Sequence, residues 1–384
     1  MTLRSRTCIT FLLLWALATT SAHALLNFND GTDLVFVTGT YSIGFDTNVF
    51  TRAVSKQSTT QSASISVDYS RVAGVITVNA NVSASAGSFG SIRGQDFADP
   101  SFSLAFRKRY GRTTGTLSLT TRRESQPDPD AGERTHDAYY SSDLDLRYPV
   151  NDRYYFTNAL GYSWKDYLNQ PAFSNLTTLN DSFAVNYVYD SKLDLNAGYV
   201  FSLNDTSKDT HAFDQSLLIG ASGSILPKLS GTLSVGIQQR SSDSKIGGRE
   251  KFTSFTSATS LKWLFSRRIS FNGELNEDFS TTSTDITVNR LSGGIHGTAS
   301  LSTRYICSAG VTDTISYYLG KAGYITGTTT DREDNLLQFD VSLGVAITTH
   351  IRTTLAYVYM LNTSNDSSAS FTRQLLTLTI AATY

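Results

Sequence analysis

The stretch Leu193-Asp-Leu-Asn-Ala-Gly-Tyr-Val-Phe-Ser-Leu203 decides the fold of this chain, because apolar and polar side chains alternate along it. The odd positions from Leu193 to Leu203 are apolar, and the positions between them are mostly polar or small. Successive side chains of a strand point to opposite faces, so the alternation predicts a strand with one apolar and one polar face. A helix would scatter the apolar residues around its circumference.

The same alternation recurs in the segments 229–239, 269–279 and 337–347, each at least 11 residues long. Strands of soluble sheets usually have about five or six residues. A tilted strand that crosses a bilayer needs about 9 to 11. The segments therefore have the length of membrane-crossing strands.

Two kinds of connection alternate along the chain. Eight are short turns, at residues 71–74, 109–112, 148–152, 190–192, 226–228, 266–268, 302–304 and 349–352. Nine are longer and more polar, at residues 46–59, 88–95, 125–136, 168–175, 204–211, 240–250, 280–286, 320–333 and 362–369. Short periplasmic turns and longer extracellular loops are typical of outer-membrane barrels.

These connections predict an all-β fold, a transmembrane antiparallel up-and-down β-barrel of about 18 strands with both termini in the periplasm. Merging two weak strands, in the regions 86–106 or 284–322, would give sixteen. After residue 24 no apolar run approaches the roughly 18 residues of a membrane helix. The 32 basic and 33 acidic residues are nearly balanced, and nothing in them suggests binding of nucleic acid.

The first 24 residues predict a cleavable secretory signal peptide. Arg4 and Arg6 precede an apolar run that begins at Phe11, and the small residues Ala22 and Ala24 form an A-x-A cleavage site. We expect the mature protein to be a single barrel domain, 25–384, in the cell outer membrane. It retains one cysteine, at position 307, and so has no internal disulfide.

The last segment places Leu376, Leu378, Ile380 and the terminal Tyr384 on one face of a strand. This segment resembles the C-terminal signal of outer-membrane barrel proteins, which the barrel assembly machinery recognises. The resemblance implies that this machinery is a partner during insertion, alongside outer-membrane lipid. Aromatic residues gather near both kinds of connection, as expected for two interfacial belts.

The segment Tyr41-Ser-Ile-Gly-Phe-Asp-Thr-Asn-Val-Phe50 leads from the first strand into its loop. With the signal peptide and the barrel pattern, it resembles the beta-barrel porin 2 group of outer-membrane proteins. The resemblance implies a barrel often associated with exopolysaccharide production and without an established catalytic activity. The residues alone favour a simpler role, in which Asp46 and Asn48 end the strand and bond to their own loop backbone.

The sequence offers few candidates for chemistry, and we expect no enzyme, cofactor or metal site. His211 and Asp214 could form an acid–base pair, but neighbouring side chains of a strand diverge, which favours a solvated histidine. Asp128, Asp130 and Glu133 could hold calcium, but their spacing departs from an EF-hand, which favours a solvated acidic loop.

The remaining candidates are charged residues on the polar face of the strands. A charge facing hydrocarbon costs up to about 2–4 kcal/mol at mid-depth, so these residues should face the lumen. They are Asp68, Arg107, Arg122, Asp143, Asp145, Arg147, Asp194, Lys262, Glu274, Asp340 and Arg352. They either line a pore and tune which solutes pass, or pair with one another and fill the lumen.

Two functions remain open. One is a porin-like passive channel for small hydrophilic solutes. Only about ten residues separate Ala24 from Leu34, which argues against a plugged 22-stranded transporter. The other is a non-conducting accessory barrel of an exopolysaccharide system that binds glycan or partner proteins. The predicted loops look too short to fold into the lumen, so we expect a monomer.

Overall fold

The computed structural model describes residues 26–28, 33–245, 248–320 and 332–384. The predicted signal peptide, with Ala22 and Ala24, lies outside the described residues. Among the residues that are described, no helix is long and apolar enough to cross a membrane.

The described chain forms one antiparallel sheet that closes on itself. Its strands are β1 (Leu26–Phe28), β2 (Asp33–Asp46), β3 (Ser58–Ala73), β4 (Ile76–Phe89), β5 (Phe97–Lys108), β6 (Thr114–Asp128), β7 (Glu133–Pro149), β8 (Tyr154–Tyr167), β9 (Leu176–Val188), β10 (Leu193–Thr206), β11 (His211–Leu226), β12 (Leu229–Ser244), β13 (Gly248–Trp263), β14 (Ile269–Thr281), β15 (Thr287–Ser300), β16 (Tyr305–Leu319), β17 (Glu333–Ala346), β18 (Ile351–Ser364) and β19 (Phe371–Thr383).

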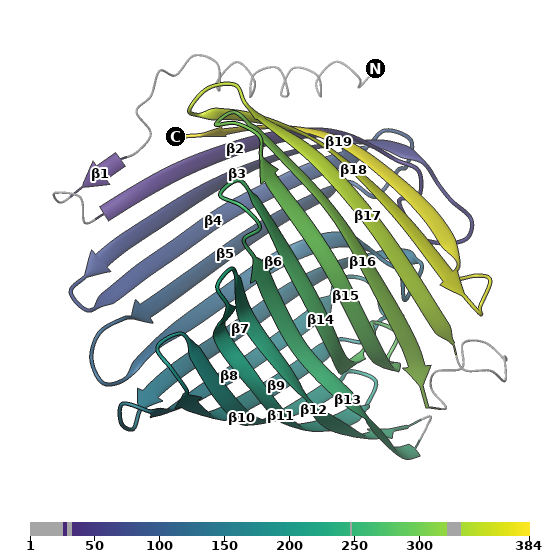
Figure 1. The fold of residues 1–384 in the computed structure, drawn as a ribbon. Helices are drawn as coiled ribbons and strands as arrows, with labels where there is room; N and C mark the ends of the chain where they lie inside the picture. The colour runs from purple at the N-terminus through teal and green to yellow at the C-terminus, as the bar shows by residue number, and fades with distance from the viewer. Residues whose placement is uncertain (1–25, 29–32, 246–247, 321–331) are drawn as a thin grey trace.

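Each strand from β2 to β19 pairs with the next one along the chain, and β19 pairs with β2. In Figure 1 the purple β2 and the yellow β19 lie side by side, and the strands between them wrap around a common axis. The short β1 pairs with the start of β2. The ring therefore has eighteen strands, which confirms the prediction and excludes the sixteen-stranded alternative.

The eight short turns all lie at one end of the barrel, where β2 begins and β19 ends. The opposite end differs from the prediction, because several strands run further than expected. Only residues 129–132 connect β6 to β7, so the loop predicted at 125–136 is mostly strand. Residues 204–206 and 240–244 are likewise strand. Strands that continue into water are polar on both faces, so the alternation that marks them fades.

The outer surface of the barrel is largely apolar, although the strand registers also place Asp181 and Asp313 on it. The side chains of Leu217, Ile219 and Phe255 are 68%, 66% and 74% exposed. Aromatic rings pack near both ends. The ring centroids of Trp263 and Phe265 lie 5.4 Å apart at the short-turn end, and those of Tyr140 and Trp164 lie 5.3 Å apart at the other. Such a surface requires lipid around it, so this barrel is an outer-membrane protein whose short turns face the periplasm.

Candidate functional site

The inner face of the barrel carries all eleven residues predicted to line a pore. In each strand they alternate with the apolar residues of the outer surface, so that Asp194, for example, lies between the outward Leu193 and Leu195. Cross-strand partners are also inward and small or polar, as in the pairs Asp143–Gly161, Lys262–Ser230 and Arg352–Ala381. The structure thus places them around the lumen; their effect on permeation stays a prediction.

Their positions along the strands define three levels. A periplasmic rim, one or two residues from the strand ends, contains Arg107, Arg147, Asp194, Lys262 and Arg352. A middle belt, four to six residues from the same ends, contains Asp68, Asp143, Asp145, Glu274 and Asp340, together with His296. Arg122 lies higher, eight residues beyond Thr114, where β6 begins.

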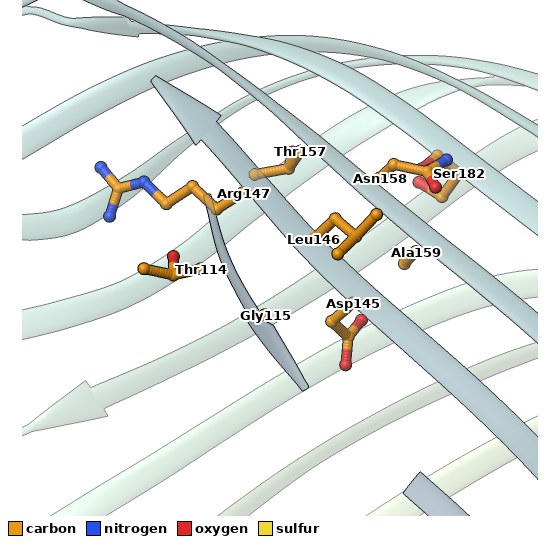
Figure 2. Close-up of a pocket in the computed structure, with 9 residues that line it drawn as sticks. All are labelled: Thr114, Gly115, Asp145, Leu146, Arg147, Thr157, Asn158, Ala159 and Ser182. Carbon is orange, nitrogen blue, oxygen red and sulfur yellow. The ribbon is translucent and has the colours of Figure 1, made fainter. Parts of the chain in front are cut away.

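Figure 2 shows a shallow pocket of about 250 Å³ in the periplasmic half of the wall. Asp145 and Arg147 line it together with Thr114, Thr157 and residues of β8 and β9. The charged ends of Asp145 and Arg147 point apart in this view. The two side chains are therefore available to the lumen rather than to each other.

The third level, toward the extracellular end, is dominated by closely paired charges. Arg240 is fully buried and donates to both carboxylate oxygens of Asp214, at 2.6 and 2.8 Å. Arg373 donates to both oxygens of Asp46, with its Nη2 atom 2.7 Å from Oδ2. Arg332 forms an ion pair with Asp334. These pairs satisfy charges that burial would otherwise penalise.

The β6–β7 hairpin crosses the extracellular mouth of the barrel. Asp130, in its turn, accepts a hydrogen bond from Arg290 Nη2 of β15 at 3.1 Å and one from the Tyr318 hydroxyl of β16 at 2.5 Å. Arg332 donates to the backbone oxygens of Pro129 and Asp130. In the ring of eighteen strands, β6 and β15 stand opposite each other. The hairpin tip is therefore anchored to the far wall.

Other loops meet at the same place. Ser283, between β14 and β15, donates to Asp128 of the hairpin at 2.6 Å, and its backbone oxygen accepts from the amide of Ser174 at 2.8 Å. Asp285 of the same loop accepts from Thr210 at 2.8 Å. Loops that follow β6, β8 and β10 are thus joined to one loop across the mouth. We call this set of contacts the mouth bridge.

The mouth bridge corrects one expectation, that no loop is long enough to fold into the lumen. The strands β6 and β7 extend beyond the bilayer, so the hairpin reaches across although its turn has only four residues. Beneath it, Ile286, Val288 and Tyr318 form a buried cluster. Burial disfavours the charged form of Arg332, but its hydrogen bond to Asp334 and the nearby Tyr318 more than offset this, so the pKa of the guanidinium is raised.

The candidates for chemistry find other roles. His211 Nδ1 lies 2.7 Å from Asp205 Oδ1, whereas Asp214 points inward to Arg240. The side chains of His211 and Asp214 therefore diverge, as expected. Asp128 and Asp130 serve the mouth bridge, so neither the calcium site nor the solvated acidic loop describes them. Within the described ranges, no group of three or more His, Cys, Asp or Glu residues could hold a metal ion.

The two terminal motifs take part in closing the barrel. Asn48 donates to the backbone oxygen of Arg52 at 2.8 Å, as expected for a residue that bonds its own loop. Leu376, Leu378 and Ile380 pair with β2, and the backbone of Tyr384 exchanges hydrogen bonds with Val37. Whether the assembly machinery recognises these residues stays a prediction.

Sequence reasoning missed the cations of the third level: Arg240, Arg290, Arg332 and Arg373. Arg240 occupies the inward parity of its strand, but it fell in a segment predicted to be a loop. Arg290 has the same inward parity in β15. Extending the period-two pattern beyond the bilayer would have identified Arg240 and Arg290 as inward residues, although it would not have identified Asp214 and Asp130 as their partners.

No family model and no curated protein matches the sequence. Among solved structures, OccK2 (OpdF) of Pseudomonas aeruginosa aligns with a TM-score of 0.51 at 9% identity, covering 91% of this chain and 98% of that one. The ferric citrate transporter FecA aligns with a TM-score of 0.51 at 9% identity, covering 85% of this chain. This chain spans only 60% of the length of FecA.

The copper transporter OprC aligns with a TM-score of 0.50 at 7% identity, covering 86% of this chain and 62% of that one. Sequence identities this low show a similarity of fold only. The fold of this chain is that of the outer-membrane β-barrels, whose similar members here are transport proteins rather than enzymes.

Proposed function

We propose that this protein is a porin-like passive channel for small hydrophilic solutes, with an entrance narrowed by the mouth bridge. The proposal rests on the difference between the two ends of the lumen, which is lined by charged side chains toward the periplasm and crossed by the hairpin toward the exterior. Below the third level, charged and polar side chains line the wall of an eighteen-stranded barrel, a size that encloses an aqueous space in porins. Above it, the hairpin tip crosses the entrance and is joined to the far wall by hydrogen bonds of Asp130.

The nature of these contacts supports a narrowed entrance rather than a solid plug. A plug that fills a lumen buries apolar surface, whereas the hairpin reaches the far wall through Asp128 and Asp130. Hydrogen bonds to water can replace such contacts, so their net contribution to stability is modest. The remaining space around the hairpin then sets the size of solute that passes.

Purified protein in a planar bilayer tests this proposal. We expect stepwise currents of uniform size in KCl, and slower permeation as neutral solutes grow larger. Absence of current at every voltage, with protein shown to be inserted, would contradict a channel.

The second candidate is a non-conducting accessory barrel of an exopolysaccharide system, with glycan or proteins of that system as partners. The mouth bridge favours it, because a permanently closed entrance would block permeation. Membership of the beta-barrel porin 2 group, suggested by residues 41–50, would agree with it. Deletion of the gene should then alter surface polysaccharide while the purified protein carries no current; unchanged polysaccharide would argue against it.

A further inference from the structure

We propose that the lumen selects cations over anions, and that the carboxylates of the middle belt are the residues that determine this preference. The inference rests on the proposed channel function and names its class of substrate: small hydrated cations, whether inorganic or organic. It follows from how the charges are distributed along the lumen.

The middle belt contains five carboxylates and no Arg or Lys side chain. Asp68 lies on β3, Asp143 and Asp145 on β7, Glu274 on β14 and Asp340 on β17. They therefore surround the lumen instead of forming one cluster on one wall. Any ion that travels along the barrel passes this ring of negative charge.

The belt carboxylates have little compensation. Asp68 accepts hydrogen bonds from Ser66 and Asn81, and Asp143 accepts one from Ser141, all neutral donors. Among the described residues, Asp145 and Glu274 form neither an ion pair nor a side-chain hydrogen bond. Hydrogen bonds from neutral groups keep a carboxylate ionised without cancelling its charge.

The basic group of the belt is His296, whose Nδ1 lies 3.6 Å from Asp340 Oδ1. That Asp340 oxygen is buried and accepts no hydrogen bond. His296 therefore faces only one of the five carboxylates, and among the described residues the other four have no basic side chain within 4 Å. The belt differs in this respect from the third level, where Asp46, Asp130, Asp214 and Asp334 each face an arginine.

The periplasmic rim carries the opposite sign, so its influence has to be weighed. The guanidinium carbon of Arg147 lies 3.9 Å from the ring centroid of Tyr155, and the Tyr155 hydroxyl donates to Asp194 at 2.7 Å, so a rim cation and a rim acid contact the same tyrosine. The rim lies at the end of the strands, next to the periplasmic turns. Asp68, Asp143, Glu274 and Asp340 lie about three to five residues beyond the rim, roughly 10 to 15 Å along the strands, which exceeds the Debye length of about 8 Å at physiological salt. Asp145 is nearer, about 7 Å along β7 from Arg147.

A permeating ion therefore meets the rim as a screened surface and the belt as a less screened ring. Charges in a confined space with low-dielectric walls focus their field along the lumen and raise the local concentration of ions of opposite sign. The belt accordingly dominates selectivity, and the rim affects mainly the rate of entry from the periplasmic side.

The test measures reversal potentials across a KCl gradient centred on about 0.15 M, where the rim is screened, for the whole mature protein in a planar bilayer. Wild type should favour potassium over chloride. The double variant Asp145→Asn/Glu274→Gln should lower the permeability ratio of potassium to chloride at least about twofold, because each carboxylate attracts potassium and repels chloride. The rim variant Lys262→Gln is the matched control and should leave the ratio equal or higher.

The outcomes separate the two proposals. Absence of current in wild type would refute the channel and the selectivity together. Current without a preference for potassium would refute selectivity alone, as would a preference that the double variant leaves unchanged. If the double variant does not insert, Glu274→Gln alone decides the question, since that side chain makes no hydrogen bond in the described part of the chain; an unchanged ratio would again overturn the inference.

Discussion

Replacing Asp130 by asparagine should release the β6–β7 hairpin from the far wall and widen the entrance of the barrel. The substitution keeps the size of the side chain and one acceptor oxygen but removes its charge. It therefore weakens the contacts to Arg290 and Tyr318 without leaving a cavity.

The size of the effect follows from these two contacts. Hydrogen bonds to charged groups contribute about 1.5 to 3 kcal/mol each. The side chains of Asp130 and Arg290 are 18% and 35% exposed, so solvent screening lowers the contribution of their ion pair. A combined loss of about 2 to 3 kcal/mol would lower the equilibrium constant for the bridged state about 30- to 150-fold.

Single-channel recording measures the consequence directly. We expect Asp130→Asn to spend more time in a state of high conductance than wild type. Glu133→Gln is the matched control, because it removes a carboxylate from the start of β7 that makes no cross-barrel contact among the described residues. If Asp130→Asn and Glu133→Gln both behave like wild type, the hairpin does not limit the entrance and the reasoning is wrong.

Three further predictions concern the rest of the barrel. Asp128→Cys with Ser283→Cys should be joined by a short thiol-reactive crosslinker that holds the mouth bridge closed, because the native side chains are in hydrogen-bond contact at 2.6 Å; current should fall on crosslinking, and either single variant should not respond. Arg240→Met should cost about 3 to 5 kcal/mol of unfolding free energy, because it leaves Asp214 without its cation. Arg249 is exposed, so Arg249→Met should cost little in the same urea titration. Cys307 faces outward beside Leu343, so in intact membranes it should react with a lipid-soluble maleimide and not with a charged one, unlike a cysteine placed at Ser302 in a periplasmic turn.

The fold could be predicted almost completely, because one local rule generates it. Alternation in segments such as 193–203 marks each strand and its two faces at once, and the same parity places residues as distant as Asp68 and Asp340 in the lumen. Up-and-down topology adds no further unknown, since each strand pairs with its neighbour along the chain. The closing pair, β19 with β2, follows from the barrel itself.

The mouth bridge could not be predicted by the same rule. Asp130 and Arg290 are 160 residues apart and lie on opposite walls, so no local pattern relates them. The polar composition of 125–136, with its prolines, indicated a loop in water, whereas the segment is mostly strand and its carboxylates contact the far wall. It did not indicate direction, because a hairpin that bends inward over a hydrated lumen and one that points away need the same polar residues.

The chemistry of the bridge also explains why these charges are concentrated at one end of the lumen. A hairpin held by apolar contacts would have to expose hydrophobic surface to water whenever it moved, which costs free energy in proportion to the area exposed. A hairpin held by Asp128 and Asp130 exchanges protein hydrogen bonds for water hydrogen bonds, at a net cost of a few kcal/mol. Both arginines that it leaves behind keep an acidic neighbour: Arg332 keeps Asp334, and Arg290 keeps Asp278, its cross-strand partner in β14, as well as the hydroxyl of Ser316. Opening the hairpin therefore leaves neither arginine without an acidic neighbour, which keeps the free-energy difference between the bridged and the open entrance small enough for both to be populated.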